Sequence, residues 1–332
     1  MKLKDLISIY FFKTEKIAKD FRKDNIVTLQ FFQRSNDVKL CGINEVLALL
    51  AKNTNTKKYT IRYLPEGSIV NDREVVLELE GHYYEFGIWE GMIDGILARQ
   101  SSIATNAYHI MKAAKNKFVI SMADRADHYR NQIADAYALG IGGIHNYSTM
   151  ASSNHDPNHT FGSMPHALIQ MFDGDIIRAC HAYKKAFPKS DLYALVDFNN
   201  DVISDSLACL KVFGKELCGV RVDTSKSMRD RMFAEDKNEF GVTVNQVKNL
   251  RKALDEHGGS HVKIIVSSGF DAKRIAEFEE NKAPVDIYGV GASLLKIWVN
   301  FSADATKLDG KKIAKAGRGY SFNPKLQLWK GK

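Results

Sequence analysis

Closely spaced cysteines are missing from this sequence. It holds four, Cys41, Cys180, Cys209 and Cys218, and no C-x-x-C pair. Zinc ribbons and disulfide frameworks both depend on short cysteine spacings, so the sequence argues against both. We expect four free thiols, most of them buried.

Long apolar runs are missing too. No window approaches the roughly 18 uninterrupted apolar residues that a membrane helix needs. The short apolar run at 6–12 is followed at once by Lys13, without a small-residue cleavage pattern, so we expect neither a membrane helix nor a signal peptide. A cytoplasmic protein is the resulting expectation. We find no internal repeat, and the Ser/Asn/His-rich stretch 145–160 reads as a loop.

What is present is ordinary globular composition with a basic excess. The chain has 332 residues, 45% apolar and 26% charged, which fits one large core with a smaller domain. Lysine and arginine number 47 against 39 acidic residues, a net charge of +8 that favours anionic partners. The excess does not separate phosphates from nucleic acid or a membrane surface. Because no basic and aromatic cluster typical of RNA-binding proteins is present, we expect no nucleic-acid partner.

The hydrophobic pattern changes along the chain. Residues 43–51 have helical periodicity, whereas 58–64 and 75–85 alternate like strands, which indicates an α+β domain over about 1–104. After that, strand-like apolar runs at 118–122, 192–197, 217–223, 262–267 and 285–290 alternate with helical stretches such as 201–213, 242–257 and 271–281. Such alternation predicts βαβ units and a parallel sheet, closed as a barrel at least as readily as open.

Polar and small residues stand at the ends of four of these strands. Asp197 and Asp223 end two of them, and 267–269 and 289–291 end two more. The carboxyl edge of a parallel sheet carries the active site in barrels and open α/β folds. Each residue has a plainer explanation, since aspartate caps helices and glycine makes turns. Four successive ends nonetheless point to an active-site edge.

Two of the strand ends have the composition of a phosphate site. Ser267-Ser268-Gly269 and Gly289-Val290-Gly291 each close a strand and precede a helical segment. Backbone N–H groups there would face an anion. We expect Ser268, Gly269, Gly289 and Gly291 to bind one phosphate monoester; the alternative is that the glycines only relieve crowding.

Three further charged residues could contact a ligand. Arg221 and Asp223 lie two apart on one strand and so on the same face, and Arg125 follows the strand at 118–122. A guanidinium suits a carboxylate or phosphate. A buried ion pair that stabilises the barrel explains Arg221 and Asp223 equally well.

His166 follows a turn of small residues, 162–165, and should open a helix. A lone histidine is more often structural than catalytic. His145, His155 and His159 upstream raise the alternative of a metal cluster, but their spacing matches no familiar zinc motif.

These segments together resemble the nicotinate phosphoribosyltransferases, which have the type II phosphoribosyltransferase fold. The most specific segment is Gly162-Ser163-Met164-Pro165-His166-Ala167-Leu168, close to the family's G-T-M-P-H-A-L. Further matches are Leu64-Pro65-Glu66-Gly67, Gly95-Ile96-Leu97-Ala98, Ile103-Ala104-Thr105, Gly219-Val220-Arg221-Val222-Asp223-Thr224, Ser267-Ser268-Gly269, Tyr288-Gly289-Val290-Gly291, Phe301-Ser302-Ala303-Asp304, Asp309-Gly310-Lys311 and Ala314-Lys315.

The resemblance implies an irregular parallel α/β barrel at 105–297 and a C-terminal segment, 298–332, that packs on the N-terminal domain. It implies that nicotinate attacks 5-phosphoribosyl-1-pyrophosphate to give nicotinate mononucleotide and pyrophosphate, with Mg²⁺ accompanying the phosphates. ATP hydrolysis would be coupled through phosphorylation of His166. Asp197 and Asp223 would supply carboxylate charge to the transition state.

Other roles follow from the same resemblance. Arg125 would bind the carboxylate of nicotinate, with Arg221 as a second contact to the ring or a phosphate. Tyr10 would stack on the pyridine ring, often from a neighbouring subunit, so we expect a homodimer or larger homo-oligomer in which the monomer is inactive. Some relatives end in a cysteine-rich metal knuckle; no cysteine follows Cys218 here, so we expect no structural zinc.

The sequence departs from the family at one place. Where the family commonly has an aromatic-Gly-x-Arg-Arg run, this chain has Met122-Ala123-Asp124-Arg125-Ala126, without the aromatic residue and the second arginine. Nicotinamide therefore stays open as the base. A polyanion-binding protein on a degenerate enzyme fold is the alternative from another class.

Overall fold

The computed structural model describes residues 2–115, 117–235 and 237–331. These divide into two compact units. The first comprises Met1–Thr105, Tyr137–Gly142 and Lys296–Lys332, and the second comprises Asn106–Ala136 and Gly143–Leu295. The long helix α4 (Glu90–Ala113) begins in the first unit and ends in the second.

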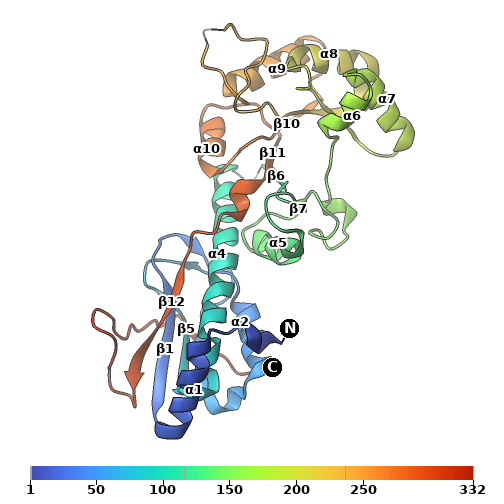
Figure 1. The fold of residues 1–332 in the computed structure, drawn as a ribbon. Coiled ribbons are helices and arrows are strands. Elements are labelled where there is room, and N and C mark those ends of the chain that lie inside the picture. Colours follow the sequence, from blue (N-terminus) through green and yellow to red (C-terminus); the bar gives the residue numbers. More distant parts are fainter. Residues whose placement is uncertain (1, 116, 236, 332) are drawn as a thin grey trace. The chain divides into compact units, whose positions relative to one another are not determined.

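An antiparallel sheet forms the first unit (Figure 1). Its strands are β12 (Phe301–Leu308), β1 (Ile26–Gln33), β5 (Val75–His82), β3 (Tyr59–Tyr63) and β13 (Gln327–Leu328), in that order. A separate pair joins β2 (Val38–Lys39) to β4 (Ile69–Val70). The pairing of β12 with β1 shows the tail returning to the N-terminal sheet, as expected.

Helices complete the core of the first unit. They are η1 (Leu3–Leu6), α1 (Ile9–Phe21), α2 (Ile43–Asn53), η2 (Thr56–Lys58), α3 (Tyr83–Phe86) and η3 (Gly87–Trp89). The helix predicted at 43–51 is confirmed, because Ile43, Val46 and Leu50 fall on one buried face. The strand predicted at 75–85 is shorter than expected: Tyr83 starts α3, and Phe86 is fully buried from that helix.

A curled parallel sheet forms the second unit. Its order is β7 (Asn146–Tyr147), β6 (Phe118–Ser121), β11 (Ile287–Val290), β10 (Lys263–Val266), β9 (Leu217–Val222) and β8 (Leu192–Leu195). The five predicted strands are confirmed, and the edges β7 and β8 do not pair with each other, so the sheet is a half-barrel.

Helices follow the strands of the parallel sheet, as the alternating pattern predicts; one of them, α5, continues from Tyr137 on into the first unit. They are η4 (Tyr129–Asn131), α5 (Gln132–Ile141), η5 (Pro157–His159), α6 (His166–Met171), α7 (Ile176–Ala186), α8 (Val202–Phe213), η6 (Gly214–Glu216), α9 (Val244–Glu256), α10 (Ala272–Glu280) and η7 (Ala292–Leu295). The predicted mixed α/β fold is therefore confirmed.

The cysteines and the lengths of the helices bear on two predictions from the sequence, free thiols and no membrane-spanning helix. Cys41, Cys180 and Cys209 are buried, Cys218 is half-buried, and all four are free thiols. In the described parts of the chain, no helix combines the length and apolar character that crossing a bilayer requires.

Candidate active site

The carboxyl ends of four neighbouring strands form a continuous edge of the half-barrel. β11, β10, β9 and β8 are adjacent and parallel, so the residues that follow them stand side by side. A hydrogen bond confirms this closeness: Ser267 Oγ, after β10, donates to Asp223 Oδ1, after β9, at 2.6 Å. The sequence placed its candidate residues at this edge, and the structure brings them together there.

His166 and Asp197 form a hydrogen-bonded pair at this edge. His166 Nε2 lies 3.1 Å from Asp197 Oδ1, and His166 is the first residue of α6, as predicted. The Asp197 side chain is 6% exposed and the His166 side chain 42%. A carboxylate acceptor fixes the tautomer with the proton on Nε2. Nδ1 then carries the lone pair, and no hydrogen bond to it is recorded within residues 2–115, 117–235 and 237–331.

Neighbouring groups and burial have opposite effects on the pKa of Asp197. Burial raises the pKa of its carboxyl, the neighbouring His166 lowers it, and the charge of Asp223 raises it again. The two carboxylates are therefore close enough to interact, and together they concentrate negative charge at the strand ends. Such charge stabilises a cation that develops nearby.

Arg221 connects β9 to the segment before α6. Its Nη1 donates to Ser163 Oγ at 2.9 Å and its Nη2 to the Met164 carbonyl at 3.4 Å. In the described chain Arg221 makes no direct ion pair with Asp223, but the charge of Asp223 raises the pKa of Arg221, so the two groups interact without contact. Burial lowers the pKa of Arg221, but the guanidinium of arginine stays charged in proteins.

A cavity of about 360 Å³ adjoins Arg221. One part of its lining is aromatic and apolar, formed by Phe118, Phe161, Tyr193, Met122, Ile265 and Ile287. The charged side chains of its lining, besides Arg221, are Asp191, Lys263 and Asp286. Phe118 and Phe161 meet edge to face with ring centroids 4.9 Å apart. The buried Nε of Arg221 has no hydrogen-bond partner among the described residues. A cavity with aromatic walls and one unsatisfied guanidinium N–H suits a flat ring that carries an acceptor group.

The β10–α10 loop approaches two cations. Ser268 and Gly269 are consecutive left-handed residues, with φ of 73° and 74°. A Cβ on Gly269 would lie 2.5 Å from Lys226 Cε, so the loop backbone and this lysine are in close contact. Arg274 Nη1 donates to the Ser268 carbonyl at 2.8 Å. Backbone N–H groups beside such cations can bind a phosphate.

Two glycines stand at the end of β11: Gly289 within the strand and Gly291 directly after it. A Cβ on Gly289 would lie 2.7 Å from Met122 Sδ, the end of a flexible side chain, and 3.1 Å from Ser267 Cβ, so the space beside this glycine is narrow. A Cβ on Gly291 would lie 3.2 Å from the Met122 carbonyl oxygen. Gly291 stands between β11 and η7, where a side chain would crowd that carbonyl.

The remaining candidates lie in the loop after β6, on α1 and in η5. Arg125 is exposed in the loop after β6, and its charge lowers the pKa of Arg221 further, so the two guanidinium groups are neighbours. Tyr10 belongs to the first unit, on α1, and is 58% exposed. His159 contacts Asn146, and no group of three metal-ligating side chains is found in the described residues, which removes support for a histidine metal cluster.

Sequence reasoning missed Lys226, Phe161 and Tyr193. Lys226 lies in the long segment between β9 and α9, and nothing in the sequence indicates that this segment approaches Gly269. The sequence could have indicated Tyr193, because side chains alternate between the two faces of a strand. Along β8 this places Tyr193 on the face opposite to that of Leu192 and Ala194, toward the cavity.

Comparison with known proteins shows which families the chain is similar to. The family model for the quinolinate phosphoribosyl transferase N-terminal domain matches residues 8–101. The curated relatives include the nicotinate phosphoribosyltransferase pncB2 of Mycobacterium tuberculosis, 26% identical over 77% of this chain and 51% of that protein. The nicotinate phosphoribosyltransferase of Bacillus subtilis is 26% identical over 70% of this chain and 45% of its own length. The chain thus spans about half the length of the curated relatives it matches.

Solved structures agree on the fold. The nicotinate-nucleotide pyrophosphorylase of Pyrococcus furiosus is 29% identical with a TM-score of 0.83, over 98% of this chain and 82% of that one. Human nicotinic acid phosphoribosyltransferase, 17% identical with a TM-score of 0.68 over 95% of this chain and 77% of that one, shares the fold. The resemblance to the nicotinate phosphoribosyltransferases, inferred from the motifs, is confirmed.

Proposed function

We propose that this protein is a nicotinate phosphoribosyltransferase, which makes nicotinate mononucleotide and pyrophosphate from nicotinate and 5-phosphoribosyl-1-pyrophosphate. The observation that carries the proposal is the aromatic-walled cavity beside Arg221, next to a strand edge that holds two carboxylates and a phosphate-type loop. The names of the curated relatives and of the Pyrococcus furiosus structure support the same pyridine nucleotide chemistry.

The cavity would bind the base. Phe118, Phe161 and Tyr193 would surround the pyridine ring, and Arg221 would donate its free Nε–H toward the ring carboxylate. Arg125, next to Arg221, would add a second positive charge for the same carboxylate. This arrangement favours nicotinate over nicotinamide, because an uncharged amide gains less from two cations.

The strand edge would carry the reaction. The bond between ribose C1 and the pyrophosphate oxygen breaks, the bonding electrons leave with pyrophosphate, and the pyridine nitrogen forms the new bond to C1. Asp197 and Asp223 would stabilise the positive charge that develops on the ribose. Ser268, Gly269 and Gly291, with Lys226, would bind the 5′-phosphate.

Mg²⁺ fits this edge as a companion of the substrate phosphates. It usually takes one or two protein carboxylates together with phosphate oxygens and water, and Asp197 and Asp223 are the carboxylates available here. When bound, the ion would neutralise the leaving pyrophosphate.

Coupling to ATP would use His166. Its Nε2–H donates to Asp197, so Nδ1 is the nitrogen that would attack the γ-phosphorus of ATP, forming an N–P bond as ADP leaves. Asp197 would then stabilise the positive charge on the phosphorylated ring.

We also propose a homodimer or larger assembly, since α1 exposes Ile9, Tyr10, Ile17 and Phe21.

A substrate comparison tests the proposal. The full chain is incubated with 5-phosphoribosyl-1-pyrophosphate, Mg²⁺ and one of nicotinate, nicotinamide or quinolinate, with and without ATP, and the mononucleotide is detected by mass spectrometry. We expect nicotinate mononucleotide with nicotinate, and more of it with ATP. Arg221→Gln should abolish it, whereas Arg178→Gln, a surface change on α7, should not. Product from nicotinamide or quinolinate alone would refute the proposed substrate, and no product from any base would refute the proposed reaction.

A further inference from the structure

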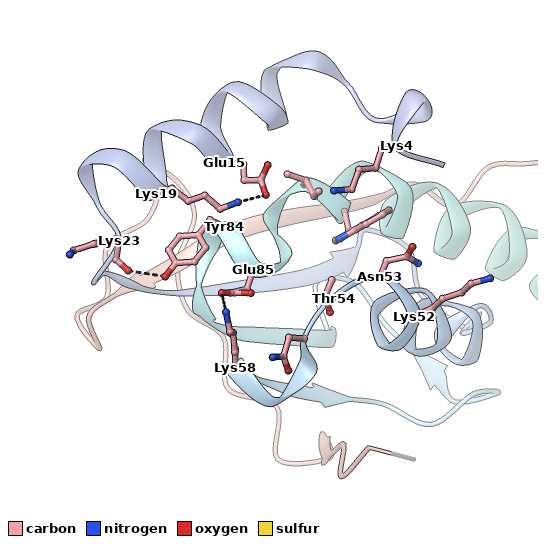
Figure 2. Close-up of a pocket in the computed structure, with 13 residues that line it drawn as sticks. Lys4, Glu15, Lys19, Lys23, Lys52, Asn53, Thr54, Lys58, Tyr84 and Glu85 are labelled. Carbon is pink, nitrogen blue, oxygen red and sulfur yellow. Dashed lines mark hydrogen bonds and ion pairs between the residues drawn. The ribbon is translucent and has the colours of Figure 1, made fainter. Parts of the chain in front are cut away.

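A second cavity is lined by residues of the first unit alone, none of which is assigned to the reaction. Its volume is about 740 Å³, and Figure 2 shows it between α1, the end of α2 and the segment around Tyr84. Five lysines line it: Lys4, Lys19, Lys23, Lys52 and Lys58. Two glutamates, Glu15 and Glu85, are the acidic residues of its lining.

Both glutamates are already neutralised. Lys19 Nζ lies 3.0 Å from Glu15 Oε1, and Lys58 Nζ lies 2.9 Å from Glu85 Oε1, as the dashed lines in Figure 2 mark. Lys4, Lys23 and Lys52 make no ion pair in the described part of the chain. The lining therefore carries three uncompensated positive charges, which raise the local concentration of anions.

Helix dipoles explain why some of these lysines stand at helix ends, but not why all of them line the same cavity. Lys19 is in the last turn of α1 and Lys52 in the last turn of α2, where cations stabilise a helix. Lys4 and Lys58 also lie in the last turns of η1 and η2, but these helices have only four and three residues, so their dipoles are small. Dipole stabilisation in four separate helices does not explain why the lysines line one cavity. The carbonyls at the end of α2 are satisfied locally, because Thr54 Oγ1 donates to the Leu50 carbonyl at 2.7 Å and Asn53 Nδ2 to the Leu49 carbonyl at 2.8 Å.

The cavity offers charge and polar groups but no surface for a nucleobase. Trp89 and Ile88 are 1% and 5% exposed, so neither presents a face for stacking. Tyr84 stacks on His82, with ring centroids 5.4 Å apart, and its hydroxyl donates to the Lys23 carbonyl. Lys23 and Lys52 lie at opposite edges in Figure 2, and their flexible stems let the ammonium groups move toward a bound ion.

We propose that this cavity binds a chain of phosphates, as in pyrophosphate or the phosphate groups of a nucleotide, at a site separate from the strand edge of the half-barrel. The charge spacing suits an ion with at least two phosphates, because Lys4, Lys23 and Lys52 surround the cavity instead of meeting at one point. Binding does not depend on the proposed reaction, although pyrophosphate would be a product of that reaction.

Residue-resolved lysine acylation tests the proposal, because it separates this cavity from phosphate binding elsewhere. The full chain is acylated at rising concentrations of pyrophosphate, phosphate or ATP, and the modification of each lysine is followed by peptide mass spectrometry. We expect pyrophosphate and ATP to protect Lys4, Lys23 and Lys52, and also Lys58 of the same lining, at equal concentrations. Phosphate should protect these lysines less, and added salt should remove the protection. Lys13 and Lys57, which lie outside the lining, should stay unprotected.

Matched charge variants complete the test. One variant removes three lysines of the lining: Lys4→Gln, Lys23→Gln, Lys52→Gln. In this variant the pyrophosphate concentration needed to protect Lys58 should rise about tenfold, since three exposed contacts are lost. Lys13→Gln, Lys57→Gln, Lys312→Gln removes the same charge from the same unit and should leave it unchanged. Equal effects of both variants, or protection of Lys57 equal to that of Lys4, would overturn the proposal. Protection by ATP without protection by pyrophosphate would also overturn it, because recognition would then require the nucleoside.

Discussion

The pairing of His166 with Asp197 gives the two ring nitrogens different roles. Because Nε2 is hydrogen-bonded to a carboxylate that is nearly buried, the lone pair is held on Nδ1. Replacing the imidazole removes that nucleophile but leaves Asp223, the β10–α10 loop and Arg221 in place. Under the proposed function, one substitution therefore separates phosphoryl transfer from ATP from phosphoribosyl transfer to the base.

We expect His166→Asn to abolish ATP hydrolysis and acid-labile labelling from γ-labelled ATP, while some ATP-independent formation of the mononucleotide persists. His159→Asn is the matched control, because His159 is an exposed histidine of the same unit that contacts only Asn146 among the described side chains. The measurement is labelling and product formation on the same samples. Labelling that survives in His166→Asn would show that another residue accepts the phosphate.

The site was predictable where strand ends specify it. Asp197, Asp223, Ser268 and Gly291 could be placed because short apolar runs mark the strands, and the residue after each run must lie at the sheet edge. Lys226 could not be placed, because its approach to Gly269 depends on the path of an irregular segment between β9 and α9. The hydrogen bond from His166 to Asp197 joins residues 31 apart and depends on how α6 is oriented, which the sequence leaves open.

Among elements, α4 carries two acidic residues in an unfavourable environment. Glu90 and Asp94 are one turn apart, and the pKa of each is raised to about 7. Burial is the main cause for both; the charge of Asp94 adds to the shift of Glu90, and the charge of Asp304 on β12 adds to both. Asp304 is paired with Arg318, whose Nε lies 3.1 Å from Oδ2, whereas Glu90 and Asp94 have no ion pair in the described residues. Asp94 Oδ1 is also buried without a hydrogen bond there.

These shifts predict that the protein becomes less stable as pH rises. Both folded-state pKa values lie above the ordinary 4.5 and 3.8, so the folded state binds protons more tightly than the unfolded state. The resulting stabilisation is complete below about pH 4 and is lost as pH rises through 7. Thermal melts should therefore give a lower Tm at pH 8 than at pH 5.5.

Asp94→Asn checks the cause of this dependence. The amide has no charge to bury, so at pH 8 the variant should melt about 2 °C higher than the original chain, with a smaller change between the two pH values. Asp72→Asn, at an exposed turn, should keep the original dependence. A Tm that is the same at both pH values in the original chain would contradict the assignment.

The bounds of helices and strands agree with the sequence-based prediction where the periodic pattern of apolar side chains determines them. α2, α8, α9 and α10 were predicted within a few residues because their apolar positions repeat with helical period. β7 and β13 have two residues each, too few to show alternation, and exist only through pairing with β6 and β3. β5 ends early for a related reason: Tyr83 and Phe86 pack from a helix, although the sequence continues to alternate.

For the whole molecule, the exposed apolar side chains of α1 point to a partner. Tyr10 and Phe21 are 58% and 77% exposed on one short helix. A second copy of the chain would cover them in a symmetric pair. If Tyr10 reaches the cavity of that copy, each active site contains residues of two chains. Tyr10→Ala should then raise KM for nicotinate about tenfold, the worth of one aromatic contact, with little effect on kcat.

Mixing two defective chains distinguishes a shared site from a site within one chain. Tyr10→Ala is co-refolded with His166→Asn in equal amounts, and ATP-coupled product formation is measured at nicotinate concentrations near the original KM. If Tyr10 acts across the interface, half of the dimers are mixed, and one site in each mixed dimer combines an intact His166 with an intact Tyr10. About a quarter of all sites should then recover the original KM. If Tyr10 serves its own chain, every site keeps one lesion and no such component appears. Light scattering on the same samples measures the mass, and a monomer with full activity would contradict the shared site.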